Sequence, residues 1–161
     1  MSEGKVIYPP TLKDWGLLLI RLMLAWVFIY HGSQKLFGAF GGMGMVGFEH
    51  FIASVGAPMP HLSAYLSALT EFCGGIVLLL GTGTRLAAIP MCINMGVAVW
   101  VMHGNGFSGV HDQGGYEYPL ELGVVIFALL LAGPGRLTLG ALLRGARMGA
   151  GQGPASQGGR K

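Results

Sequence analysis

The 161 residues are 52% hydrophobic and only 11% charged, with a mean hydropathy of +0.59 and a formal net charge of +3 at pH 7. Soluble domains carry about 25% charged residues, so this composition excludes an ordinary soluble enzyme and favours an integral membrane protein.

Four apolar runs occupy most of the chain, over residues 15–31, 62–80, 86–103 and 119–131. The first three are close to the roughly 20 residues that a helix needs to cross the hydrocarbon layer of a bilayer. We therefore predict an all-α integral membrane protein with four transmembrane helices packed as a bundle. The fourth run is expected to continue through Leu139, with a kink at Gly133-Pro134-Gly135.

A further helix is predicted in the long loop between the first two runs. Apolar residues recur there at roughly helical spacing until Gly56-Ala57-Pro58 ends the pattern. They are Val46, Phe48, Phe51, Ile52 and Val55. We expect a short amphipathic helix on the outer face that covers the end of the bundle.

The positions of the basic residues predict the orientation of the chain. Eight of the ten Lys and Arg residues lie in the N-terminal segment, in the loop at Arg85 or in the C-terminal tail. Basic loops stay in the cytoplasm, so both termini are expected there. This divides the chain into a cytoplasmic segment over 1–14, a bundle domain over 15–143 and a flexible basic tail over 144–161. The basic tail is expected to contact lipid headgroups rather than nucleic acid.

The chain resembles the DoxX family through a series of short motifs that together cover about residues 15–143. The motifs are Arg21, HGSQKLFG from His31, Gly56-Ala57-Pro58, EFCGG from Glu71, GTGTRLAA from Gly81, Met95, His103 and GPGRL from Gly133. Family members commonly continue with Ser-Leu-Asp, where this chain has Thr138-Leu139-Gly140.

The resemblance implies a compact bundle of four transmembrane helices in the bacterial inner membrane. Some relatives, of the DoxD type, are membrane subunits of a thiosulfate:quinone oxidoreductase, and many others are associated with oxidative or electrophile stress. The resemblance therefore implies a fold more firmly than a reaction.

Three of the four apolar runs carry a charged side chain, namely Arg21, Glu71 and Glu121, and the first two lie well inside their runs. Counted from the outer ends of their helices, both come out near mid-membrane, so we predict that they pair. The pair could fix the register of two helices, or it could belong to a proton or substrate relay.

Further polar residues are expected at the outer end of the bundle. They are His31, Lys35, His103, Glu117 and Glu121. Together they suit proton-coupled chemistry on a quinone, with a histidine donating to a carbonyl oxygen, Lys35 stabilising negative charge and Glu121 orienting a histidine or relaying its proton. Arg21, Glu71 and Glu117 would assist in binding. Each residue alone could equally be a polar helix end.

No metal site is predicted. Cys73 and Cys92 form no CxxC motif, and the histidines lack the spacing of ligands on one helix. Quinone, which the outer polar residues favour, is the expected small molecule. Electrons are expected from a small sulfur compound such as thiosulfate or from a partner protein in a larger membrane complex.

Three functions are compatible with the sequence. The first is a membrane subunit of a quinone-linked oxidoreductase, which the outer polar residues favour. The second is a non-catalytic anchor that recruits a partner enzyme, and the third is a small transporter.

Overall fold

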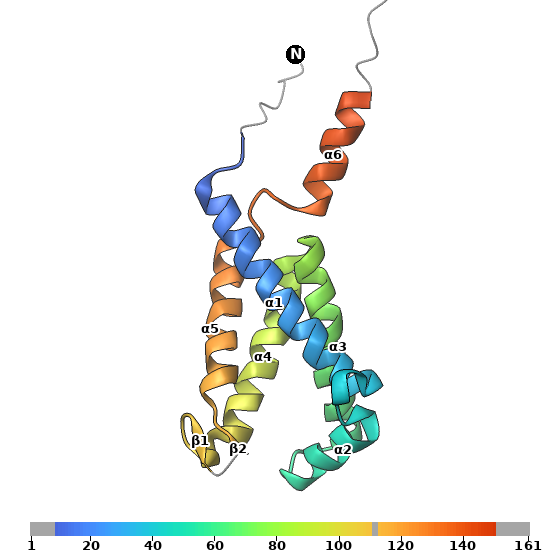
Figure 1. Ribbon diagram of the computed structural model, residues 1–161, viewed down its shortest axis with the longest axis vertical. Coiled ribbons are helices and arrows are strands. Elements are labelled where there is room, and N and C mark those ends of the chain that lie inside the picture. Colours follow the sequence, from blue (N-terminus) through green and yellow to red (C-terminus); the bar gives the residue numbers. More distant parts are fainter. Residues whose placement is uncertain (1–8, 111–112, 151–161) are drawn as a thin grey trace, which may run out of the picture.

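The computed structural model describes residues 9–110 and 113–150, and this part of the chain is helical apart from one tiny hairpin (Figure 1). The α-helices are α1 (Leu12–Phe37), α2 (Gly44–Ser54), α3 (Pro60–Leu80), α4 (Thr84–Met102), α5 (Glu117–Ala132) and α6 (Leu139–Ala150). Two 3-10 turns, η1 (Ala39–Gly41) and η2 (His103–Asn105), follow α1 and α4. The strands β1 (Gly109–Val110) and β2 (Gln113–Gly114) pair antiparallel before α5.

Helix α1 begins at a capping box formed by Thr11 and Asp14, in which each residue bonds the backbone of the other. Asp14 also accepts a hydrogen bond of 3.0 Å from the amide of Arg136, which ties the C-terminal segment to the start of α1. Hydrogen bonds from the Thr11 amide and hydroxyl, together with that from Arg136, lower the pKa of Asp14 to about 2. The helix ends at Gly38, whose φ of 66° is the left-handed conformation that glycine adopts readily.

Helices α1 and α3 cross in Figure 1. They pack closely because glycines, which have no side chain, lie at their contact. A Cβ at Gly32 would lie 2.6 Å from the backbone nitrogen of Phe72. A Cβ at Gly75 would lie 2.9 Å from the backbone nitrogen of Ile29. Small residues allow such close approach, which aligns α1 antiparallel to α3 in a fixed register.

The main core lies where α4 and α5 meet α1 and α3. Its fully buried members include Leu24, Phe28, Leu78, Met91 and Ile126. A second, smaller core joins α2 to the first half of α3 through Phe48, Ala64 and Ala68. The predicted helix in the first long loop is thus confirmed, and α2 lies at the end of the bundle remote from α6 (Figure 1).

Two helical segments of the described chain are long and apolar enough to cross a membrane, Pro60–Leu80 and Thr84–Asn105. The other two predicted spans coincide with α1 and α5, which are not among these two segments, and α5 has only 16 residues. A helical fold is therefore confirmed, while the fourfold crossing stays a prediction.

The fourth run does not continue as a kinked helix to Leu139. Helix α5 ends at Ala132, and Gly133 and Gly135 adopt positive φ values of 80° and 73° that interrupt a helix. Helix α6 then starts afresh, with the hydroxyl of Thr138 accepting a hydrogen bond of 3.1 Å from the amide of Ala141. Residues 144–150 of the expected flexible tail are helical, and residues 151–161 lie outside the described part.

Candidate ligand pocket

A pocket of about 950 Å³ lies between α2, the first half of α3, the second half of α4 and the last turns of α1. Its walls are mainly apolar and include Phe48 and Phe51 from α2, Leu66 from α3, and Val97 and Trp100 from α4. The volume is at the upper end of the range for pockets that hold small molecules. The pocket is therefore large enough for an aromatic ring with substituents.

A buried carboxylate forms the polar centre of this pocket. Glu71 is only 3% exposed, and its Oε1 accepts hydrogen bonds from Lys35 Nζ at 2.5 Å and from Asn94 Nδ2 at 3.1 Å. These three residues, which we call the Glu71 cluster, come from α3, α1 and α4. Because one cation faces one anion, the cluster adds no net charge to the pocket.

Lys35 also ties the pocket to α2. Its ammonium group lies 4.7 Å from the centre of the Phe48 ring, a distance at which a cation is attracted to an aromatic face. The same lysine thus contacts Glu71 on α3 and Phe48 on α2, so it links α2 to the polar centre of the pocket.

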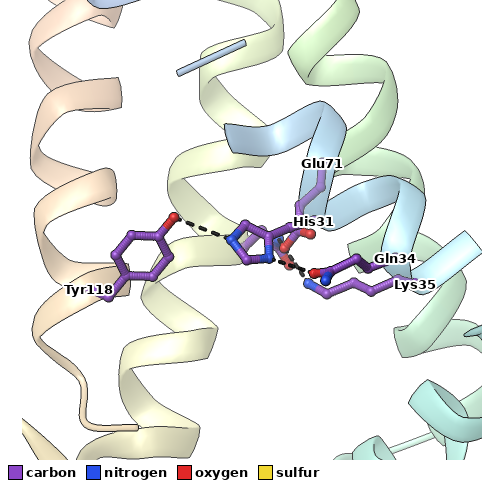
Figure 2. A network of polar contacts seen from close by, with 6 residues as sticks. His31, Gln34, Lys35, Glu71 and Tyr118 are labelled. Atoms are coloured by element: carbon purple, nitrogen blue, oxygen red, sulfur yellow. Dashed lines mark hydrogen bonds and ion pairs between the residues drawn. The ribbon is translucent and has the colours of Figure 1, made fainter. Parts of the chain in front are cut away.

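His31 occupies the edge of the pocket next to α5. Figure 2 shows its ring between Gln34 and Tyr118, with Nδ1 at 3.1 Å from Gln34 Oε1 and Nε2 at 3.3 Å from the Tyr118 hydroxyl. Since the amide oxygen of Gln34 can only accept, Nδ1 carries the proton, and in the neutral ring Nε2 accepts from Tyr118. This arrangement gives His31 one fixed tautomer and links α1 to α5.

The structure brings three predicted site residues, His31, Lys35 and Glu71, to one pocket. The remaining outer residues lie elsewhere: His103 is exposed and its Nδ1 is 3.2 Å from the carbonyl of Trp100, and Glu117 accepts from Ser108. Glu121 is exposed on α5, and none of these three lines the pocket. Their functional roles stay predictions.

The predicted pairing of Arg21 with Glu71 is wrong. The buried guanidinium of Arg21 donates 2.6 Å hydrogen bonds to the carbonyls of Pro134 and Leu137, and it lies against Gly81 at the far end of α3. The depth expected for Arg21 in the membrane was wrong because α1 ends at Phe37, several residues after the expected end at His31. The antiparallel register that places Gly32 beside Phe72 therefore brings Lys35, and not Arg21, to Glu71.

Other pocket residues were missed or underrated from sequence. Asn94 of α4 bonds the buried carboxylate of the pocket, on the neighbouring helix α3. Its position as an amide inside an apolar run was the available signal. Gln34 and Trp100, which line the pocket, and Tyr118, which contacts His31 from α5, had no such signal.

Within residues 9–110 and 113–150, no three His, Cys, Asp or Glu side chains form a group that could hold a metal ion. His111 and Asp112, whose side chains are also of types that bind metals, lie outside the described residues.

Comparison with known proteins gives one consistent result. Residues 16–104 match the DoxX family. The chain is 30% identical to Inner membrane protein YphA of Escherichia coli over 76% of its own length and 86% of the relative's, and 32% identical to an uncharacterized membrane protein of Mycobacterium tuberculosis over 77% and 78%.

A further relative, from Bacillus subtilis, is named "Putative oxidoreductase CatD" and is 30% identical over 50% of this chain and 54% of its own length. No solved structure gives a significant match. The predicted resemblance is confirmed by these matches, and the chain is a membrane protein of the DoxX family.

Proposed function

We propose that this chain is the membrane subunit of a redox complex and that it binds a quinone head group in the pocket around the Glu71 cluster. The observation that carries the proposal is the combination of an apolar pocket of about 950 Å³ with one neutral, hydrogen-bonding cluster in its wall. A quinone ring is flat, uncharged and apolar except at its two carbonyl oxygens, which need hydrogen-bond donors.

The pocket offers matching groups for each part of such a ring. Phe48, Phe51 and Trp100 provide aromatic surface, against which rings pack favourably. Lys35 has three N–H donors and uses one on Glu71, so another can donate to a carbonyl oxygen. A small anion such as thiosulfate is a poorer fit, because the charge of Lys35 is already balanced by Glu71.

The membrane setting of the proposal uses α1, α3, α4 and α5 as four crossing helices with both termini in the cytoplasm. The pocket then lies toward the outer side of the bacterial inner membrane, where a lipid-soluble quinone can enter from the bilayer. Electrons would come from a partner protein, and the name of the Bacillus subtilis relative supports a redox association.

The test is quinone titration of the purified chain in mild detergent, with Trp100 as the reporter. Replacing Trp15 and Trp26 by Phe leaves Trp100 as the sole tryptophan, and a short-chain quinone should then quench its fluorescence saturably. The matched control keeps Trp26 alone, through Trp15→Phe and Trp100→Phe, because Trp26 is exposed on α1 and does not line the pocket. Its quenching should rise without saturation.

Equal, unsaturable quenching of both proteins would reject quinone binding in the pocket. If a mild-detergent preparation then still contained a stable partner enzyme, the non-catalytic anchor would take the place of the quinone subunit.

A further inference from the structure

The two oxygens of the Glu71 carboxylate are in unequal surroundings. Oε1 accepts from both Lys35 and Asn94, whereas Oε2 is buried and has no hydrogen-bond partner among the described residues. Glu71 belongs to the wall of the pocket, and its buried Oε2 is an acceptor with no partner among the described residues.

An unpaired buried acceptor is unfavourable, and the protein leaves few ways to relieve it. Lys35 and Asn94 already bond the other oxygen, and the neighbouring His31 is held between Gln34 and Tyr118. A donor on a molecule bound in the pocket would supply the missing partner. Because Oε2 is buried, its contact with a bound donor requires a rotation of the carboxylate about its last bond, which is a broad torsion and which also moves Oε1 relative to Lys35 and Asn94.

Oxidised and reduced quinones differ in whether they can donate a hydrogen bond to Glu71 Oε2. A quinone carbonyl only accepts hydrogen bonds, so it can bind Lys35 but leaves Oε2 unpaired. A hydroquinone hydroxyl both donates and accepts, so it can donate to Oε2 while its oxygen accepts from Lys35. One hydroxyl group thus satisfies both sides of the Glu71 cluster.

We propose that the pocket selects the hydroxyl-bearing, reduced form of its ligand, a hydroquinone, through a hydrogen bond to Glu71 Oε2. This inference rests on the proposed function, since it concerns the same pocket. Leaving a buried acceptor unpaired weakens binding by at least several-fold, so the hydroquinone is expected to bind about tenfold more tightly than the quinone.

The experiment compares three ligands that share one ring and one short tail, using the protein with Trp100 as sole tryptophan under anaerobic conditions. They are the quinone, its hydroquinone and the dimethyl ether of the hydroquinone, which cannot donate. The hydroquinone should bind about tenfold more tightly than the quinone, and the dimethyl ether should be no better than the quinone.

A variant of Glu71 tests whether this residue causes the preference for the hydroquinone. Glu71→Gln replaces one carboxylate oxygen by an N–H donor, so it should abolish or reverse the preference for the hydroquinone. Glu49→Gln is the matched control, because this half-buried carboxylate on α2 pairs with His61 and does not line the pocket. It should keep the preference of the parent protein.

The outcomes separate the two proposals. Saturable binding of quinone and hydroquinone with equal affinity would overturn the selection of the reduced form and leave quinone binding intact. Binding of neither would reject the proposed function itself. If Glu71→Gln does not fold, the comparison of hydroquinone with its dimethyl ether on the parent protein still decides the question, and equal affinities would overturn the inference.

Discussion

Lys35 and Glu71 depend on each other because neither charge has another compensating partner of opposite sign in the described pocket. The Lys35 side chain is 22% exposed and the Glu71 side chain 4%, so Glu71 is the more deeply buried of the two. A buried ion without its partner costs more than the intact pair contributes. The pair therefore restricts which substitutions the pocket tolerates.

Removing Lys35 alone should lower the free energy of unfolding by about 3 kcal/mol, because Glu71 is left as an uncompensated buried charge. The double variant Lys35→Met/Glu71→Gln should lose distinctly less. Unfolding by SDS in mixed micelles measures both, with Lys13→Met, an exposed lysine on the same helix, as the control. Equal losses in the single and double variants would show that the two side chains are not energetically coupled.

Arg21 is another buried charged residue, and it contacts the segment between α5 and α6. Its planar guanidinium donates hydrogen bonds to two backbone carbonyls in the segment between α5 and α6. A hydrogen bond from the Arg136 amide to Asp14 attaches the same segment to α1 a second time. A lysine at position 21 keeps the charge but lacks the planar guanidinium.

Arg21→Lys is expected to loosen this attachment and to speed tryptic cleavage after Arg136 about tenfold, since a hydrogen bond to a charged group contributes about 1.5 kcal/mol or more. Mass spectrometry of timed digests in detergent reports the rate. Cleavage after Arg85, which lies at the start of α4, provides the internal reference. An unchanged ratio of the two rates would mean that the two carbonyl contacts do not hold the segment.

At the scale of elements, the contact of α1 with α3 sets the geometry of the pocket. The glycine at position 32 allows the backbones to approach, and the resulting register delivers Lys35 to Glu71. Any side chain added at this position has to move α1 away from Phe72, the residue after Glu71. The pocket should therefore respond to changes at the helix contact.

Gly32→Ala is expected to lower stability by about 1 to 3 kcal/mol through overpacking. Gly16→Ala on the same helix should instead be neutral or raise stability by about 0.5 kcal/mol, since a Cβ there meets nothing within 4 Å and alanine favours the helix. SDS unfolding of the two variants measures the difference. Destabilisation of equal size at both positions would contradict the role given to the close helix contact.

The sequence predicted elements better than contacts, and the reason is physical. Apolar runs and the glycine and proline boundaries predicted α1 to α5, because hydrophobic burial and backbone freedom are local properties. The partner of Glu71 was not predictable in the same way, since it depends on where α1 ends and on which glycines face α3. Lys35 and Glu71 were each identified as site residues, but their pairing required the register.

For the whole molecule, the orientation in the membrane stays a prediction based on the basic residues. After Cys73 and Cys92 are replaced by alanine, Ser108→Cys should react with an impermeant maleimide in intact cells. Ser2→Cys should react only after lysis. The reverse labelling pattern would show the opposite orientation, with the pocket toward the cytoplasmic side.

Because Lys35 and Glu71 balance each other, occupation of the pocket by a neutral ring moves no net charge along the membrane normal. Transfer of one full charge through a membrane potential of 100 mV would change the binding free energy by about 2.3 kcal/mol. A neutral ligand meeting a neutral cluster avoids this dependence, so its affinity should be the same in energised and de-energised vesicles. The pocket would then remain equally available to its ligand when respiration slows and the membrane potential collapses.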